Sequence, residues 1–597
     1  MSWMWRTKPR SIIRTVQWFK FFSQLEGKNW NQKDDIHFSK HDNKKIRPIR
    51  RQYIYNAHSG EDLNIGNLTF QQYLSGLFDK NETESNGRND KTTFEFFGFG
   101  YVNKDGIINV TKVGNRISDE KFNAEDFLKQ MLKLQFPNPV SDNLEGFEKD
   151  KYIFPLELLC RAINKFDYLN RSEIALLFGC TSINDFDKAY FAIEHFRKQY
   201  KMLTNKNDIK KVKKICAESY LLAYGKLENK IDTYYEYAEA FCRCLVYTGI
   251  FKMTGRSLAS KIKVPEYSQL KFKMILDNHN FEKKQFNNLD EYMLWYGDTD
   301  SVVLPWDNYD LRKEIVEEKI KYINELSTNN DFIKNYDGNI ETAVRDIICE
   351  SQEILSKDNS ITTLKDVENN LVNFIIGIYE REYIEKLSKT SVARKEILDK
   401  YDEILDTIDM GALWLEVNTW KSLVAISGDK IVKRNFNIEE DLTPRSFAPG
   451  IGNTPDMELY TDEYIIIPEV SLMSGTKQWE HEGSSVIDHV LSFINDNKDK
   501  KVRGLFITNA LNIRTKWQFF ILNRESWVGN PVPVIPLTIK QYKSIITVFY
   551  EKNLDILEFI GLLEQLQESA LISENYDMWF DKSNQIVQEW IEQSAAS

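Results

Sequence analysis

Apolar residues recur at helical spacing through much of the chain, and this pattern predicts most of its secondary structure. After Pro155, apolar residues return at every third or fourth position, which predicts a helix that begins at the proline. The next apolar stripe lies between Asn170, which has Glu173 three residues later in the spacing of a capping box, and Gly179. The sequence therefore predicts two consecutive helices with defined ends.

Two stretches combine strand-forming residues with turn residues. Residues 94–117 consist of two β-rich arms around Asp105-Gly106, which is a strong hairpin signal. Residues 234–258 begin with a helix that ends at Gly249, and a short strand and a turn follow. Helices and hairpins are the parts of winged-helix domains, so we predict two winged-helix-like subdomains: the first hairpin with the two helices above, and the second stretch. Small helical bundles with hairpins give the same pattern.

The middle and the last third of the chain show different patterns. Residues 310–408 are charged and helical throughout, which predicts a helical linker. In the last third, apolar strands at residues 505–508 and 534–537 alternate with helical sequence, including a helix that we predict to start at Ser485 with Asp488 at the capping-box position. This alternation predicts an α/β domain with a mixed sheet.

Composition predicts an ordered chain. Among 597 residues, glycine and proline are scarce (26 and 14), and no run of 18 apolar residues indicates a membrane span, so we predict a cytoplasmic protein with no membrane partner. The six cysteines form no CxxC pair, which indicates buried, reduced thiols rather than a zinc site. The net charge of −11 by itself argues against nucleic-acid binding.

Basic residues are nevertheless concentrated in two places in the N-terminal half. Residues 1–51 contain thirteen lysines and arginines against four acids, and residues 197–214 contain eight against one acid. Such local patches favour nucleic-acid binding; the alternative is a solvated face over aromatic contacts. The candidate DNA-binding residues are Arg47, Arg50 and Arg51 in a predicted loop, and Lys252 and Arg256 on the second predicted wing.

Acidic residues flank an apolar hairpin in the last third. Strand alternation over residues 453–471 places Asp456 on one arm and Glu469 on the other, so that folding back brings two carboxylates together. Neighbouring carboxylates repel unless a cation lies between them, and an all-oxygen site suits Mg²⁺. The order Pro-Asp, apolar strand, Glu is the outline of the PD-(D/E)xK nucleases, with Ser471 at the position of their lysine. The alternative is a turn with solvated acids.

A second acidic motif competes with this assignment. Residues 295–303 resemble the metal-binding hairpin of B-family DNA polymerases, in which Asp298 and Asp300 would be metal ligands. The chain lacks the Ser-Leu-Tyr-Pro segment and the Lys-x-x-x-Asn-Ser-x-Tyr-Gly helix that accompany this hairpin in those polymerases. A polymerase is therefore kept only as an alternative.

Several short segments of the chain, taken together, match the motifs of one family of proteins. In the last third they are Trp414-Leu-Glu416, Gly452-Asn-Thr-Pro-Asp456-Met-Glu, Pro468-Glu469-Val-Ser, Gly475 through Gln478 to Glu482, His489, and Ile535-Pro-Leu-Thr-Ile-Lys-Gln-Tyr542. Upstream they are Phe97-Gly-Phe with Asp105-Gly106, Ser172-Glu-Ile-Ala175 and Tyr247-Thr-Gly-Ile-Phe251. Together they resemble the AlwI-type family of type IIS restriction endonucleases, which includes strand-nicking enzymes.

This resemblance implies a site-specific endonuclease that hydrolyses double-stranded DNA with Mg²⁺ at a fixed offset from a short asymmetric site. It implies a winged-helix-like DNA-recognition region at residues 1–295, a helical linker at 296–385 and a restriction-endonuclease-like cleavage domain at 386–597. The implied catalytic residues are Glu416, Asp456, Glu469, Glu482 and His489, with Asp456 and Glu469 as metal ligands. It also implies a cognate DNA methyltransferase in the host, and no catalytic role for Asp298 and Asp300.

Two function classes stay open, an active endonuclease and a DNA-binding protein whose nuclease fold is inactive. The reason is Ser471, which cannot supply the positive charge of the motif lysine; Lys477 or a second metal ion would have to replace it. The sequence contains one acidic hairpin of this type, so a monomer is expected to cut one strand. Cutting the second strand then requires a transient homodimer or a separate small nuclease subunit.

Overall fold

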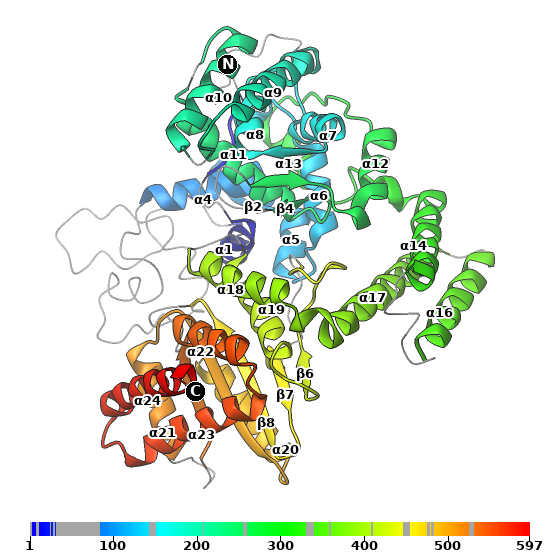
Figure 1. Ribbon diagram of the computed structural model, residues 1–597. Helices are drawn as coiled ribbons and strands as arrows, with labels where there is room; N and C mark the ends of the chain where they lie inside the picture. The colour runs from blue at the N-terminus through cyan, green and yellow to red at the C-terminus, as the bar shows by residue number, and fades with distance from the viewer. Residues whose placement is uncertain are drawn as a thin grey trace, which may run out of the picture. The chain divides into compact units, whose positions relative to one another are not determined.

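The computed structural model describes residues 3–7, 11–23, 26–27, 30, 84–141, 151–206, 208–227, 229–254, 260–329, 339–357, 360–406, 410–445, 454–473, 478, 483–524 and 531–596. It is mostly helical (64%), and its largest sheet lies in the C-terminal part (Figure 1). The chain divides into two units. The first contains the described residues up to Tyr322 together with Asp346–Glu368, and the second contains those of Ile323–Arg345 and Asn369–Ser597. The predicted linker, residues 296–385, is divided between the two units.

The first unit is built from helices and two small sheets. Its elements are α1 (Ile12–Ser23), α4 (Glu84–Phe96), β1 (Gly100–Val102), β2 (Ile108–Val110), α5 (Lys112–Ser118), α6 (Ala124–Lys133), α7 (Pro155–Phe166), β3 (Tyr168–Asn170), α8 (Arg171–Leu177), α9 (Phe186–Lys201), α10 (Ile209–Tyr224), α11 (Ile231–Val246), β4 (Lys252–Thr254), β5 (Lys261–Lys263), α12 (Gln269–Asn278) and α13 (Leu289–Tyr296). Helices α14 (Tyr309–Asn329), α16 (Asn339–Ser356) and α17 (Ile361–Glu385) contribute residues to both units.

The predicted hairpin around Asp105-Gly106 is present. β1 and β2 pair antiparallel, and Gly106 has the positive φ of 83° that a tight turn favours. The predicted strand from residue 94 is wrong at its start, because α4 continues to Phe96. The side chain of Phe94 packs edge-on against Phe19 of α1, so tertiary packing overrides the strand preference of these aromatic residues.

A second small sheet has the antiparallel strand order β3-β5-β4, and α7, α8 and α11 contact its strands or one another. The predicted helix starts are confirmed: Pro155 is the first residue of α7, and Asn170 and Glu173 form a capping box on α8. These two helices belong with the sheet of the second hairpin, and not with the hairpin around Gly106. The predicted grouping missed this because β3 has only three residues and shows no alternation.

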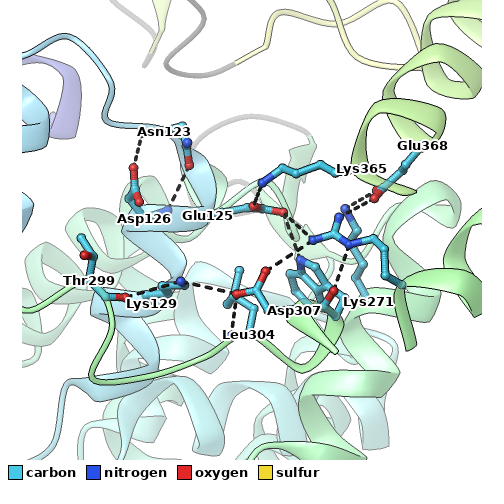
Figure 2. A network of polar contacts seen from close by, with 12 residues as sticks. Asn123, Glu125, Asp126, Lys129, Lys271, Thr299, Leu304, Asp307, Lys365 and Glu368 are labelled. Atoms are coloured by element: carbon cyan, nitrogen blue, oxygen red, sulfur yellow. Dashed lines mark hydrogen bonds and ion pairs between the residues drawn. The ribbon is translucent and has the colours of Figure 1, made fainter. Parts of the chain in front are cut away.

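Figure 2 shows a network of charged side chains within the first unit that includes Glu125, Lys271 and Glu368. Arg312 of α14 lies within ion-pair distance of Glu125, Asp307 and Glu368 in this network. The Arg312 side chain is 1% exposed and forms an ion pair with Glu368 of α17. Lys271 Nζ lies 2.7 Å from a Glu368 carboxylate oxygen, and Lys365 Nζ lies 2.8 Å from a Glu125 carboxylate oxygen. Because breaking a buried ion pair leaves an uncompensated charge, the network ties α6, α12, α14 and α17 together.

Glu125→Gln is expected to remove part of the acid sensitivity of the fold. Burial raises the pKa of Glu125, but Lys271, Lys365 and Arg312 outweigh this and lower it from 4.5 to about 2. Ionised Glu125 therefore stabilises the folded chain fully above pH 4.5, and this contribution is lost as the pH falls towards 2. Urea unfolding at several pH values measures it: the wild type should be more stable than Glu125→Gln near neutral pH, and the difference should shrink in acid. A difference independent of pH would contradict this.

The second unit contains a five-stranded sheet between helices. Its elements are α18 (Ser391–Leu405), α19 (Gly411–Val424), β6 (Ile431–Arg434), β7 (Met457–Tyr460), β8 (Tyr464–Ser471), α20 (Ser484–Asp496), β9 (Lys501–Thr508), α21 (Ile513–Arg524), β10 (Val534–Thr538), α22 (Ile539–Lys552), α23 (Ile556–Ile572) and α24 (Tyr576–Ala596). The strand order is β10-β9-β8-β7-β6, with β8, β9 and β10 parallel and β6, β7 and β8 antiparallel. The predicted mixed sheet is confirmed.

Alternation along β8 gives each face of this sheet its own core. Ile465 and Ile467 belong to a core with residues of α20 and α21, whereas Ile466 belongs to a core with residues of α19, α22 and α23. Figure 1 shows α22, α23 and α24 gathered beside the sheet. Because side chains two apart on a strand share a face, Glu469 lies on the face that α20 covers.

The start of α20 differs from the prediction. α20 begins at Ser484 after Gly483 and has no side-chain cap, so the predicted capping box of Ser485 and Asp488 is wrong: Ser485 already lies inside the first helical turn.

The six cysteines are unpaired and five are buried, but Cys349 of α16 is exposed. None of the described helices combines the length and the apolar character needed to cross a membrane.

Candidate active site

The hairpin of β7 and β8 brings two predicted carboxylates together. Tyr460 lies opposite Ile465, and the same antiparallel register, continued along both strands, places Asp456 opposite Glu469. The backbone N of Asp456 lies 3.5 Å from Glu469 Oε2, and Asp456 Oδ2 accepts a hydrogen bond of 2.9 Å from the backbone N–H of Val470. The backbone of the hairpin therefore fixes both acidic side chains at the same edge of the sheet.

His489 is the partner of Glu469. It lies on α20, the helix that covers this face of β8, and its Nδ1 is 2.6 Å from Glu469 Oε1. Burial lowers the pKa of His489, although the negative charges of Asp456 and Asp488 act in the opposite direction. A neutral imidazole that donates from Nδ1 to a carboxylate has its lone pair on Nε2, so His489 is arranged to accept a proton there.

Glu416 lies on the wall of a cavity next to Asp456. The cavity has a volume of about 90 Å³ and is lined by Leu413, Glu416, Val417, Asn435, Phe436, Asn437, Pro444, Arg445, Thr454 and Asp456. Helix α19 supplies Glu416, whereas the start of the acidic hairpin supplies Asp456. Two of the five predicted catalytic residues, Glu416 and Asp456, thus line this cavity, and Glu469 with His489 adjoins Asp456.

The oxygen ligands of this site fit a hard divalent cation. Asp456 and Glu469 converge at one edge of the sheet, and Mg²⁺ is commonly bound by one or two carboxylates that leave places for water and phosphate oxygens. Within the described ranges, no three His, Cys, Asp or Glu side chains are grouped closely enough to enclose a metal by themselves. These two carboxylates could hold a divalent cation only together with further ligands such as water, and they are not the nitrogen and sulfur ligands that zinc favours.

Ser471, which stands where the nuclease motif has its lysine, does not join this set. Ser471, at the position of the motif lysine, is 4% exposed, and its Oγ accepts a hydrogen bond of 3.0 Å from the backbone N–H of Met473. The Ser471 hydroxyl thus forms a hydrogen bond with the backbone immediately after β8. Glu482 and Lys477 lie outside the described residues.

Asn435 is a site residue that the sequence pattern did not indicate. Its Nδ2 donates to the carbonyl of Pro455 at 2.9 Å and to Glu458 Oε1 at 2.7 Å, and its backbone N–H donates to the carbonyl of Asp456 at 2.9 Å. Asn435 therefore holds the chain on both sides of Asp456. Glu458 is 3% exposed and also binds Lys433 at 2.9 Å, which explains why this buried acid keeps its charge.

Asn435→Ala is expected to slow DNA cleavage about 10-fold to 100-fold with little change in DNA affinity, as is typical when a residue that orients metal ligands is lost. The reason is that the variant loses the side-chain bonds to the carbonyl of Pro455 and to Glu458, the residues on either side of the Asp456 segment, while the backbone bond to Asp456 remains. Single-turnover cleavage rates measure the effect. Asn497→Ala is the matched control, because the side-chain amide of Asn497 bonds only the carbonyl of Phe493, at the end of α20, among the described residues. Equal rates for both variants would contradict the role of Asn435.

The predicted DNA-binding lysine lies on a basic face of the small sheet in the first unit. Lys252 of β4 lies opposite Lys263 of β5, and Lys261 shares the face of Lys263 because the two are separated by one residue. Lys261 and Lys263 are exposed, and Lys261 Nζ lies 4.0 Å from the ring centroid of Tyr168. Three lysines thus line one side of this sheet. The other predicted DNA-binding residues, Arg47, Arg50, Arg51 and Arg256, lie outside the described residues.

The polymerase-like motif has no metal-site geometry. Residues 297–303 form turns after α13 and contain no β-hairpin. Lys112 Nζ lies 3.0 Å from Asp298 Oδ1, and Lys133 Nζ donates to the backbone carbonyls of Tyr296 and Asp298 at 2.5 and 2.8 Å. Lysines therefore neutralise this acidic stretch and hold it against α5 and α6, which is a structural role.

The chain as a whole is similar to known restriction endonucleases. The sequence model of the AlwI restriction endonuclease matches residues 96–545, which is more than half of the chain. Among solved structures, the chain is similar to the small subunit (R.BspD6I2) of the heterodimeric restriction endonuclease R.BspD6I, with 24% identity over 34% of this chain and 98% of that chain and a TM-score of 0.27. No curated protein matches the chain.

The class is therefore that of the restriction endonucleases, and the predicted resemblance is confirmed. The chain belongs to the AlwI restriction endonuclease family. The matched region contains every described residue of the cavity and also His489, so the acidic site described above lies inside the part of the chain that defines the family.

Proposed function

We propose that this chain is a type IIS-like, Mg²⁺-dependent site-specific endonuclease that cuts double-stranded DNA at a fixed offset from a short asymmetric site. The observation that supports this most directly is a set of four residues in a member of a restriction endonuclease family: Glu416 and Asp456 line one small cavity, and Glu469 with its partner His489 adjoins Asp456. Phosphodiester hydrolysis needs acidic ligands for a cation and a proton acceptor for water, and this set supplies both.

Each residue of the set has a separate proposed task. Asp456 and Glu469 would hold Mg²⁺, which when bound supplies positive charge to the phosphate and makes water more acidic. His489 accepts the proton of the attacking water at Nε2, while Glu469 holds the imidazole through Nδ1. Glu416 faces the same cavity as Asp456 and orients water there by accepting a hydrogen bond. Glu482 remains a proposed fourth acid.

The first unit is proposed to recognise duplex DNA. Helices α7, α8 and α11 with the sheet β3-β5-β4 have the element order helix, strand, helix, helix, strand, strand that a winged helix requires, with α9 and α10 inserted after α8. The lysines of β4 and β5 lie on the hairpin that would act as the wing and contact phosphates. Arg47, Arg50, Arg51 and Arg256 are proposed as additional DNA contacts.

The proposed activity implies two kinds of partner, a second cleavage site and a protective DNA methyltransferase. Cutting both strands requires a second cleavage site in the opposite orientation, from a transient second copy or from a separate small nuclease subunit. A restriction endonuclease also endangers the DNA of its own host. We therefore propose a cognate DNA methyltransferase with the same recognition sequence.

Replacing Lys252, Lys261 and Lys263 together by alanine is expected to weaken DNA binding and its salt dependence. Each lysine that neutralises a phosphate contributes about 0.9 to the slope of log affinity against log salt, so the slope should fall by about 2 to 3. Fluorescence anisotropy at several salt concentrations measures the slope. The matched control replaces the same residues by arginine, which keeps the charge and should keep the slope. An unchanged slope in the alanine variant would show that this face does not contact DNA.

A plasmid assay separates the proposed function from its alternative. Supercoiled plasmid should acquire strand breaks when incubated with the purified chain and Mg²⁺, and it should stay intact with EDTA in place of Mg²⁺. Salt-sensitive DNA binding without breaks under any metal condition would favour a DNA-binding protein with an inactive nuclease fold.

A further inference from the structure

Arg445 is the one cationic side chain among the described residues that line the cavity of Glu416 and Asp456. We propose that Arg445 binds the scissile phosphate and supplies the positive charge that the lysine supplies in PD-(D/E)xK nucleases. This inference rests on the proposed nuclease function. It assigns the missing charge to a residue that precedes the acidic hairpin, and not to Ser471 or its neighbours.

A short self-closed loop fixes the backbone of Arg445 at the cavity. Residues 438 and 444 form an antiparallel bridge, and the backbone N–H of Glu439 donates to the carbonyl of Thr443 at 2.8 Å. The backbone N–H of Arg445 lies 3.4 Å from the carbonyl of Asn437. Ile438 and Leu442 of the same loop are buried in the core beside the sheet. The base of the loop is therefore anchored, so the position of Arg445 does not depend on a bound ligand.

The side chain of Arg445 has a weak partner that a phosphate can replace. Its Nε lies 3.6 Å from Glu439 Oε2, and the two side chains are 35% and 25% exposed. A pair of this length between partly exposed groups contributes little to stability. The guanidinium can therefore leave Glu439 for a phosphate at small cost, and its planar fork matches two phosphate oxygens at once.

The charges around the cavity require such a group. Glu416, Asp456 and Glu469 repel the phosphate that must approach them, and Ser471 is buried against its own strand end. During hydrolysis the water oxygen attacks phosphorus, the bond to the leaving sugar oxygen breaks, and negative charge grows on the remaining phosphate oxygens. Arg445 stabilises that charge while keeping its own proton, because an arginine stays protonated in proteins.

The first test compares cleavage by the wild-type chain, Arg445→Ala and Arg445→Lys. We expect Arg445→Ala to lower the single-turnover rate about 10²-fold to 10³-fold, as for loss of one donor to a developing oxyanion, with a much smaller loss of affinity, about threefold, for the recognition site. Arg445→Lys should retain more activity than Arg445→Ala. Guanidinium ion, added well below denaturing concentrations, should restore part of the Arg445→Ala activity. Lys430→Ala is the matched control, because Lys430 directly precedes β6 and pairs with Asp462 in the turn after β7; it should cut at the wild-type rate with no response to guanidinium.

The second test needs no cleavage. Binding without metal is measured on duplexes that carry either a phosphate or an uncharged methylphosphonate at the position cut by the wild type. We expect the charge of that phosphate and the side chain of Arg445 to be coupled: the effect of the methylphosphonate on affinity should differ about threefold or more between the wild type and Arg445→Ala. A merely structural residue would show no such coupling.

The outcomes separate this inference from the function on which it rests. If the wild type leaves DNA uncut under all metal conditions, the proposed nuclease function fails. If the wild type cuts and Arg445→Ala cuts equally fast, Arg445 does not bind the scissile phosphate. The same conclusion follows if Arg445→Ala is slow but shows neither guanidinium rescue nor coupling to the methylphosphonate.

Discussion

Asp456→Ala should abolish DNA cleavage and leave DNA binding intact. Asp456 connects the two parts of the proposed site. It lines the cavity with Glu416, its backbone N lies near Glu469, and its carboxylate accepts a hydrogen bond from the backbone N–H of Val470. Loss of a metal ligand removes several kcal/mol of transition-state charge stabilisation, so the cleavage rate should fall about 10³-fold or more.

The measurement is single-turnover cleavage of a labelled duplex, with anisotropy to follow binding. Asp462→Ala is the matched control on the same hairpin, because Asp462 lies in the turn, is 91% exposed and forms an ion pair only with Lys430 among the described pairs. It should cut at the wild-type rate. If Asp456→Ala retained wild-type activity, the active site would have to lie elsewhere in the chain.

A monomer on its asymmetric site should cut only one strand. The described residues contain one acidic hairpin of this kind, and one such site is arranged for attack at one phosphodiester. The two strands of a duplex are antiparallel, so the second cut needs a second cleavage site related by an approximate two-fold axis. We therefore expect a free monomer that produces nicked plasmid before linear plasmid.

Enzyme concentration distinguishes the two steps of plasmid cleavage. Raising it should accelerate the conversion of nicked to linear plasmid more than the first nick, because only the second step needs another molecule. Sedimentation gives the oligomeric state of the free chain under the same conditions. If dilute enzyme that sediments as a monomer made linear plasmid from a one-site substrate without a nicked intermediate, a second catalytic centre would be required.

The part of the site that the sequence could predict is the part that is local. Asp456 and Glu469 lie thirteen positions apart with one short turn between them, so strand alternation alone brings their side chains together. Asn170 with Glu173 is a local capping signal of the same kind, and it is present in the structure. Both predictions depend on contacts within one hairpin or one helical turn.

Other site residues lie outside the reach of such patterns. Asn435 meets Asp456 because β6 pairs with β7, and Arg445 reaches the cavity because residues 437–445 fold back on themselves. Turn residues such as Gly428 and Pro444 mark loops near these segments, but they do not indicate which strand or cavity the segments meet. His489 and Glu416 entered only through the family resemblance, and their helices explain their places: α20 covers the face of Glu469, and α19 borders the cavity.

In the first unit, contacts between residues far apart in the sequence determine two features that local sequence signals did not predict. The helices that start at Pro155 and Asn170 were predicted, but their sheet was not, because β3 pairs with β5 across about ninety residues of chain. The strand predicted from residue 94 is helical as far as Phe96 for a related reason. Packing of Phe94 against Phe19 and Phe22 favours the helix over the intrinsic strand preference of phenylalanine.

Run-off sequencing of a plasmid cut by the wild-type chain with Mg²⁺ tests the central claim most directly, because it maps every break to a nucleotide. For a site-specific endonuclease with separate recognition and cleavage parts, we predict breaks at one fixed distance from a single short asymmetric sequence, on one strand first. Breaks scattered without relation to any sequence would contradict the account, and so would an intact plasmid under conditions in which the chain binds DNA.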